Sequence, residues 1–307
     1  MGIRRICALM ACIPALARAD GVTAQPAPDP ALVARGAYLV NAVAACVNCH
    51  SPKDELGRPK VEGTLSGGGP GAGVWYVAPA FTVYPPNITP DVETGIGKWS
   101  EDDIKRALLQ GVRPAQDRLP NVPLAPIMYK NYFKSLMPRD LEAIVVYVRS
   151  VPAVKHDVPQ PVYKDFPPAA VSPDNGRTYT SADMEDPISR GRYLATIAHC
   201  MECHSGRAGG LADHEHALGK GGRVHTSETI KGYPAEWKTS VASNITSDPD
   251  AGIGAWTDAQ IKRAIAQGIA RDGHRLGPPM AYSSYAHMTD EDLSSIVAWL
   301  RTIPPLH

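Results

Sequence analysis

Two stretches of the chain carry the same helical pattern of apolar and polar positions. Their apolar residues recur three and four positions apart, which places them on one face of an α-helix. The two sets are Leu141, Ile144, Val145 and Val148, then Leu293, Ile296, Val297 and Leu300. We expect the helices to begin near Pro138 and Thr289 and to end before Pro152 and Pro304, because proline cannot continue a helix.

A shorter amphipathic helix is predicted upstream of each of these. Its apolar face is formed by Ile104, Ala107 and Leu108, and in the second stretch by Ile261, Ala264 and Ile265. Each helix has a capping residue, a partner three positions later and a closing glycine: Ser100, Asp103 and Gly111, then Thr257, Gln260 and Gly268. A further helix is expected to open at Asp29-Pro30 and at Asp186-Pro187, since Asp caps well and Pro is tolerated in the first turn.

These helices belong to an internal repeat. Asn87-Ile88-Thr89 recurs 157 positions later as Asn244-Ile245-Thr246, and Gly95-Ile96-Gly97-Lys98-Trp99 recurs at the same offset as Gly252-Ile253-Gly254-Ala255-Trp256. Such self-similarity indicates two copies of one unit. We therefore predict a mainly α fold with two tandem domains, at residues 29–152 and 186–305, that have long irregular loops. Residues 153–185 are rich in proline and are expected to form a partly extended linker.

A cysteine motif stands near the start of each copy. Cys46-Val47-Asn48-Cys49-His50 recurs as Cys200-Met201-Glu202-Cys203-His204. C-x-x-C-H is typical of covalent haem c attachment. The two thiols of one helical turn bond the two porphyrin vinyl groups, and the next residue, His50 or His204, offers its imidazole to the iron. A structural zinc site and a redox-active C-x-x-C pair are the alternatives.

Each copy also offers a second axial ligand. Met128 and Met280 follow the middle helix on proline-flanked stretches that could fold over the open haem face. A thioether opposite histidine raises the reduction potential of the iron, which suits an electron acceptor. The alternative for both residues is core filling, the usual role of methionine.

Residues that recur in both copies of the repeat are candidates for the lining of the haem sites. Asn87 and Asn244 lie in the repeated Asn-Ile-Thr block, and Trp99 and Trp256 close the repeated glycine block. We hypothesise that these four side chains donate hydrogen bonds to haem propionates. Asn87-Ile88-Thr89 also matches a glycosylation sequon, but its recurrence favours the haem interpretation.

The N-terminus is typical of a secretory signal peptide. Arg4 and Arg5 precede a short apolar run, and Ala17-Arg18-Ala19 resembles a cleavage site, so residues 1–19 are expected to be removed. Loss of three arginines and no acid would change the formal net charge from 0 to −3. This balance does not favour nucleic-acid binding. We expect a periplasmic protein with no transmembrane helix in the mature chain; peripheral attachment to the inner membrane, or lipidation at Cys12, are alternatives.

The ordered set of motifs resembles the c-type cytochrome subunits of bacterial alcohol, gluconate and aldehyde dehydrogenases. The pattern is C-x-x-C-H, Asn-Ile-Thr, Gly-Ile-Gly-x-Trp, a methionine near a tyrosine, and a closing helix that ends in proline. The resemblance implies class I cytochrome c folds whose first and last helices cross, with Gly36 and Gly191 at the crossings and Tyr147 and Trp299 packed nearby.

The resemblance also implies a function. We expect two covalently attached haem c groups that relay electrons from a dehydrogenase large subunit of flavin, quinone-cofactor or molybdenum type to a quinone, a cytochrome or a terminal oxidase. The protein would then be an electron-transfer subunit with no catalytic residues of its own. The alternative is a di-haem redox enzyme, either a peroxidase or a thiosulfate-oxidising cytochrome.

Overall fold

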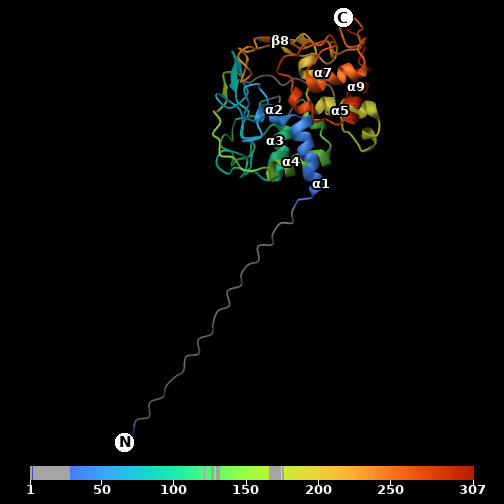
Figure 1. The fold of residues 1–307 in the computed structure, drawn as a ribbon. Coiled ribbons are helices and arrows are strands. Elements are labelled where there is room, and N and C mark those ends of the chain that lie inside the picture. Colours follow the sequence, from blue (N-terminus) through green and yellow to red (C-terminus); the bar gives the residue numbers. More distant parts are fainter. Residues whose placement is uncertain are drawn as a thin grey trace.

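A computed structural model describes Gly2 and residues 28–120, 122–125, 128, 132–165, 174 and 176–307 of the chain. The signal-peptide prediction, apart from Gly2, lies outside these residues, as do the lipidation alternative at Cys12 and part of the expected linker. In Figure 1 the N-terminal and C-terminal halves of the chain lie side by side in one body. Among the described residues, no helix is both long enough and apolar enough to cross a lipid bilayer.

The fold is mainly helical, and the two halves present their helices in the same order. The first half has α1 (Pro30–Tyr38), a π-helical turn (Leu39–Val43), α2 (Cys46–His50), α3 (Glu101–Gln110) and α4 (Pro138–Ser150). The second half has α5 (Pro187–Ile197), α6 (Cys200–His204), α7 (Asp258–Gln267), α8 (Tyr282–Tyr285) and α9 (Asp290–Leu300). Single 3-10 turns lie at Phe133–Ser135 and Ala182–Met184. The predicted helices are confirmed, whereas the predicted domain bounds stay a prediction.

The predicted helix caps are present. Asp29 accepts a hydrogen bond from the Ala31 amide, and Asp186 accepts one from the Ser189 amide. Both capping boxes are closed, with Ser100 paired to Asp103 and Thr257 paired to Gln260. Gly111 and Gly268 end α3 and α7 with φ angles of 71° and 64°, a left-handed conformation that favours glycine.

Two glycines allow the first and last helices of each half to cross closely. A Cβ atom on Gly36 would lie 2.0 Å from the carbonyl oxygen of Ala143 in α4. A Cβ atom on Gly191 would lie 1.8 Å from the carbonyl oxygen of Ser295 in α9. Neither position can hold a side chain without moving backbone, so the expected role of both glycines is confirmed.

Short strands, which the sequence did not predict, connect the halves. β1 (Trp75–Ala78) pairs antiparallel with β2 (Phe81–Val83) and with β7 (Ile230–Lys231), and β2 pairs with β3 (Val162–Tyr163). Because β7 comes from the second half, this four-stranded sheet spans both halves. Two separate two-stranded sheets are formed by β4 (Arg207–Ala208) with β5 (Leu211–Ala212) and by β6 (Val224–Thr226) with β8 (Thr239–Val241).

One hydrophobic cluster runs through both halves. It includes Leu39 and Val145 of the first half and Leu194 and Val297 of the second, all at most 2% exposed. Burial of this apolar surface drives the two halves together as well as folding each one. In the described part of the expected linker, strand β3 lies on the edge of the sheet.

Candidate haem sites

The two cysteine motifs form single helical turns with the same unusual entry. Ala45 and His199, which precede Cys46 and Cys200, adopt left-handed φ angles of 48° and 62°. Residues other than glycine seldom adopt this conformation, and where they do it often marks a functional site. In both halves this backbone conformation leads the chain directly into the short helix that carries both thiols.

The four cysteines of the two motifs form no disulfide bonds. Cys46, Cys49, Cys200 and Cys203 are all free and half-buried. Burial raises the pKa of Cys46 to about 12, and it raises that of Cys200 equally. A redox-active C-x-x-C pair needs a depressed thiol pKa, so this environment disfavours that alternative. In the described part of the chain, no three His, Cys, Asp or Glu side chains gather as metal ligands would.

The histidine of each motif is oriented by a backbone carbonyl. His50 Nδ1 lies 2.8 Å from the Pro86 carbonyl oxygen, and His204 Nδ1 lies 2.8 Å from the Ser243 carbonyl oxygen. A carbonyl only accepts, so Nδ1 must carry the hydrogen, and Nε2 then keeps a free lone pair. Burial lowers the pKa of both imidazoles, which favours the neutral form that binds iron.

The Asn-Ile-Thr blocks hold these carbonyls in place. Asn87 follows Pro86, accepts hydrogen bonds from the backbone and side chain of Thr89, and donates to the Val154 carbonyl at 2.8 Å. Asn244 follows Ser243, accepts in the same way from Thr246, and donates to the Leu306 carbonyl. The amide donors that we expected at the propionates are therefore engaged with the chain beyond the last helix of each half.

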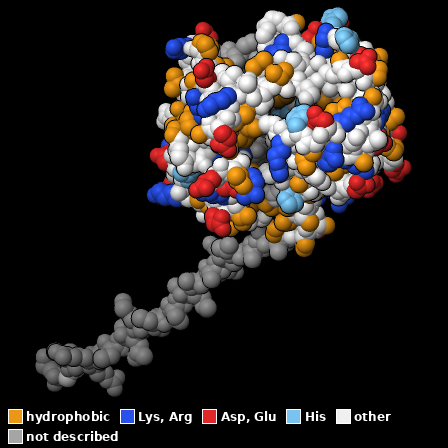
Figure 2. Space-filling view, turned by 45° about the horizontal axis from the view of Figure 1, so that its top comes forward, with side chains coloured by type: hydrophobic (Ala, Val, Ile, Leu, Met, Phe, Trp, Pro, Cys, Tyr) orange, Lys and Arg blue, Asp and Glu red, His pale blue; other side chains and the backbone are white. Residues whose placement is uncertain are grey.

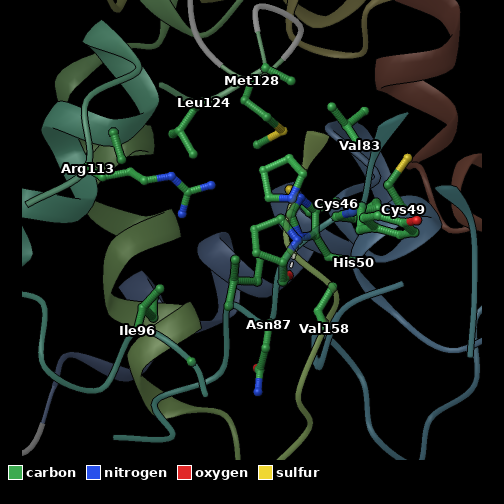
Figure 3. A pocket seen from close by; sticks show the side chains of 18 of the residues that line it. Cys46, Cys49, His50, Val83, Asn87, Ile96, Arg113, Leu124, Met128 and Val158 are labelled. Atoms are coloured by element: carbon green, nitrogen blue, oxygen red, sulfur yellow. Dashed lines mark hydrogen bonds between the residues drawn. The ribbon is translucent and has the colours of Figure 1, made fainter. Parts of the chain in front are cut away.

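An apolar cavity in the first half brings the predicted haem residues together. Cys46, Cys49, His50, Met128 and Trp99 all line it. Figure 3 shows the Met128 thioether directed into this cavity and the Asn87 amide directed away from it. Thiols for attachment, a free imidazole nitrogen and a thioether thus face one apolar space, which fits a porphyrin with two axial ligands.

Sequence reasoning missed one charged residue of this cavity. Arg113 follows the glycine that ends α3, and its guanidinium group points into the cavity (Figure 3). Its side chain is 9% exposed, it pairs with Asp117 at 3.4 Å, and its Nε has no hydrogen-bond partner among the described residues. A buried guanidinium group with an unused donor suits a haem propionate. The repeat places Ala270 at the corresponding position of the second half.

The second half presents its candidate residues in the same framework. Met280, Trp256 and Cys200 are partly buried and pack against the common core. Arg301 donates to the Trp256 carbonyl, as Arg149 does to the Trp99 carbonyl at 2.7 Å. Ligation of iron by Met280, and the propionate role of Trp99 and Trp256, stay predictions.

Comparison with known proteins shows which families the chain is similar to. Residues 188–304 match the Cytochrome c family. The chain is 31% identical over 90% of its length to the gluconate 2-dehydrogenase cytochrome c subunit of Pantoea cypripedii, and 30% identical over 92% to the fructose dehydrogenase cytochrome subunit of Gluconobacter japonicus. The chain covers 60% of the length of the first relative and 56% of the length of the second. A diheme cytochrome c-type protein of Cereibacter sphaeroides is 33% identical over 40% of the chain and is covered to 38%.

Residues 188–304 are therefore similar to the Cytochrome c family, whose members bind haem c covalently. Nearly the whole chain is similar to cytochrome subunits of dehydrogenases, as the motifs predicted.

Proposed function

We propose that the protein is a di-haem cytochrome c with two tandem class I domains, each carrying one covalently attached haem. Cys46 and Cys49 would hold the first haem, and His50 and Met128 would bind its iron. In the second domain, Cys200 and Cys203 would hold the haem, and His204 and Met280 would bind its iron. The haem supplies the one-electron chemistry, and the chain supplies attachment, ligation and burial.

The observation that carries this proposal is the orientation of both histidines. Each donates Nδ1–H to the carbonyl that precedes an Asn-Ile-Thr block, across the same 2.8 Å. A histidine that fills a core has no need of this arrangement, whereas a metal ligand depends on it. Its repetition in both halves supports one haem in each.

The physiological role that follows is an electron relay. The relatives are named as cytochrome subunits of gluconate and fructose dehydrogenases, which supports a dehydrogenase as electron donor. A quinone, another cytochrome or a terminal oxidase would accept the electrons. Two six-coordinate irons leave no open position for a substrate, so the chain would transfer electrons without catalysis of its own. The proposed location is the periplasm, where haem c attachment takes place.

Haem content and ligation test this proposal. The mature chain, produced with a cytochrome c maturation system, is expected to stain for haem on a denaturing gel and to contain two haems per chain by mass. Replacement of Cys46 and Cys49 with alanine, or of Cys200 and Cys203, should each remove one haem. A colourless protein, or one haem in the unaltered chain, would contradict it.

Carbon monoxide distinguishes a relay from a di-haem enzyme. An iron bound by both histidine and methionine resists the gas, whereas a peroxidase-type haem with an open position binds it readily. We expect no spectral change when carbon monoxide is added to the reduced protein, and negligible peroxide turnover. Rapid carbon monoxide binding at one haem would favour the enzyme instead.

A further inference from the structure

The third residue of each cysteine motif reaches across to the other half. Asn48 and Glu202 occupy the same motif position, between the two cysteines. Both form hydrogen bonds to a residue close in sequence to the other half's candidate distal methionine. The third motif residue, which is not a cysteine, therefore contacts the other half of the chain in both copies.

Asn48 bonds to the chain next to Met280. Its Nδ2 donates to the Pro279 carbonyl at 3.3 Å and lies 3.4 Å from the Tyr233 hydroxyl. That hydroxyl also donates to the Pro279 carbonyl, at 3.3 Å. The Asn48 Oδ1 accepts a hydrogen bond from Lys53 at 2.7 Å, which fixes the orientation of the amide group. Pro279 is bonded directly to Met280, so these contacts bear on the position of the thioether.

Glu202 makes the reciprocal contact. Its Oε2 accepts a hydrogen bond from the Tyr132 hydroxyl at 2.7 Å, and its Oε1 accepts one from Arg223 at 2.7 Å. Tyr132 follows Met128 by four residues and is 1% exposed. Its ring stacks on His199, the residue before Cys200, with ring centroids 4.5 Å apart.

His199 also packs against the segment that follows Met128. His199 comes from the second half, yet it lines the cavity of the first half together with Phe133 and Met128. Its ring centroid lies 4.9 Å from that of Phe133. The entry to the second cysteine motif is therefore packed against the wall that presents the first methionine.

We propose that each cysteine motif positions the distal methionine of the other domain, through Asn48 for Met280 and through Glu202 for Met128. The inference rests on the methionine ligation proposed above. Pro278 and Pro279, which precede Met280, lack the N–H group and donate no backbone hydrogen bond. Side-chain contacts from the other half therefore contribute to the geometry near each methionine, and a bond between sulfur and iron would depend on that geometry. The two haems thereby depend on one another for ligation.

Single substitutions test this dependence in the holoprotein. Proton NMR of the reduced protein gives one strongly upfield-shifted methyl signal for each iron-bound methionine, because the porphyrin ring current acts on it. Replacement of Met128 or Met280 with alanine assigns the two signals. Glu202→Ala should then broaden or remove the Met128 signal and lower the potential of the first haem, although Glu202 lies in the motif of the second. Asn48→Ala should act on the Met280 signal.

Matched variants separate positioning from general loss of structure. Glu202→Gln keeps an acceptor for Tyr132 and should restore the Met128 signal. Tyr132→Phe should reproduce the effect of Glu202→Ala, and the double variant should add nothing further. Asn41→Ala removes a 2.9 Å hydrogen bond to Tyr147 within the first half, so it should leave the Met280 signal unchanged.

The NMR signals distinguish failure of the cross-domain positioning from failure of the proposed ligation. If Glu202→Ala perturbs only the Met280 signal, or if both variants leave both signals at their original positions, the cross-domain positioning is wrong while the di-haem proposal stands. If the unaltered protein shows no upfield methionine signal, the proposed ligation itself is wrong, and this inference falls with it.

Discussion

Tyr193 of the second half donates its hydroxyl hydrogen to Asp140 of the first half across 2.7 Å. Tyr38 of the first half donates reciprocally to Asp292 of the second. Each aspartate also pairs with an arginine of its own half, Asp140 with Arg35 at 2.8 Å and Asp292 with Arg190. A tyrosine of each half thus donates to an aspartate in the first turn of the other half's last helix, α4 or α9.

The first prediction concerns the hydrogen bond from Tyr193 to Asp140. Tyr193→Phe removes one donor from Asp140, which is 5% exposed and keeps Arg35. Loss of a buried hydrogen bond to a charged group costs about 1.5–3 kcal/mol. We expect a decrease of that size in the free energy of unfolding, measured by denaturant titration. An unchanged midpoint and slope would show that Arg35 alone satisfies the carboxylate.

A second prediction follows from the helix crossings. In an isolated helix, Gly→Ala stabilises by about 1 kcal/mol. Gly36→Ala should instead destabilise the protein strongly, since the new Cβ would lie 2.0 Å from a backbone oxygen. Thermal unfolding measures the sign of the effect. Ala34→Gly, at an exposed position of the same helix, is the control and should cost only the propensity difference of about 1 kcal/mol.

The third prediction is a pH dependence caused by His199. Burial lowers its pKa from 6.5 to about 4, so the folded state favours the neutral ring. This contribution to stability is complete above pH 6.5 and is lost as the pH falls from about 6.5 to about 4. His199→Asn removes the titrating group and suits the left-handed backbone. Unfolding free energies measured across this range should fall less steeply for the variant; an identical slope would contradict the assignment.

The fourth prediction concerns Arg113 and rests on the proposed haem. A buried positive charge beside a haem favours the reduced iron, so Arg113→Leu should lower the potential of the first haem by roughly tens of millivolts, equivalent to ~1 kcal/mol. The second haem should change much less. A spectroscopic redox titration resolves the two. Arg58→Leu, which removes a 60% exposed side chain that does not line the cavity, is the control.

Local signals account for what the sequence predicted correctly. Caps, closing glycines and helical periodicity act within a few residues, so α1, α3, α4, α5, α7 and α9 could be located before the structure was known. The strands escaped prediction because they are only two to four residues long and lack a clear alternation. Their stability comes from partners in other parts of the chain, such as β7 for β1.

The same distinction between local signals and long-range contacts applies to the candidate sites. The cysteine and histidine residues are adjacent in sequence and carry a fixed spacing, so their pattern could be read directly. The asparagines were assigned to propionates because they recur, and that role stays a prediction; the sequence did not reveal that they also donate to carbonyls more than 60 residues away. Arg113 lies outside the repeated motifs, and only its position in the cavity reveals it.

The antiparallel pairing of Trp75 with Lys231 means that the linker is not a natural place to divide the protein. A severed N-terminal piece would expose the hydrogen-bonding edge of β1, and such edges invite aggregation. It would also lose the hydroxyl that Tyr193 supplies to Asp140. Any shortened version made for study should therefore retain both halves, because each supplies hydrogen-bond partners to the other.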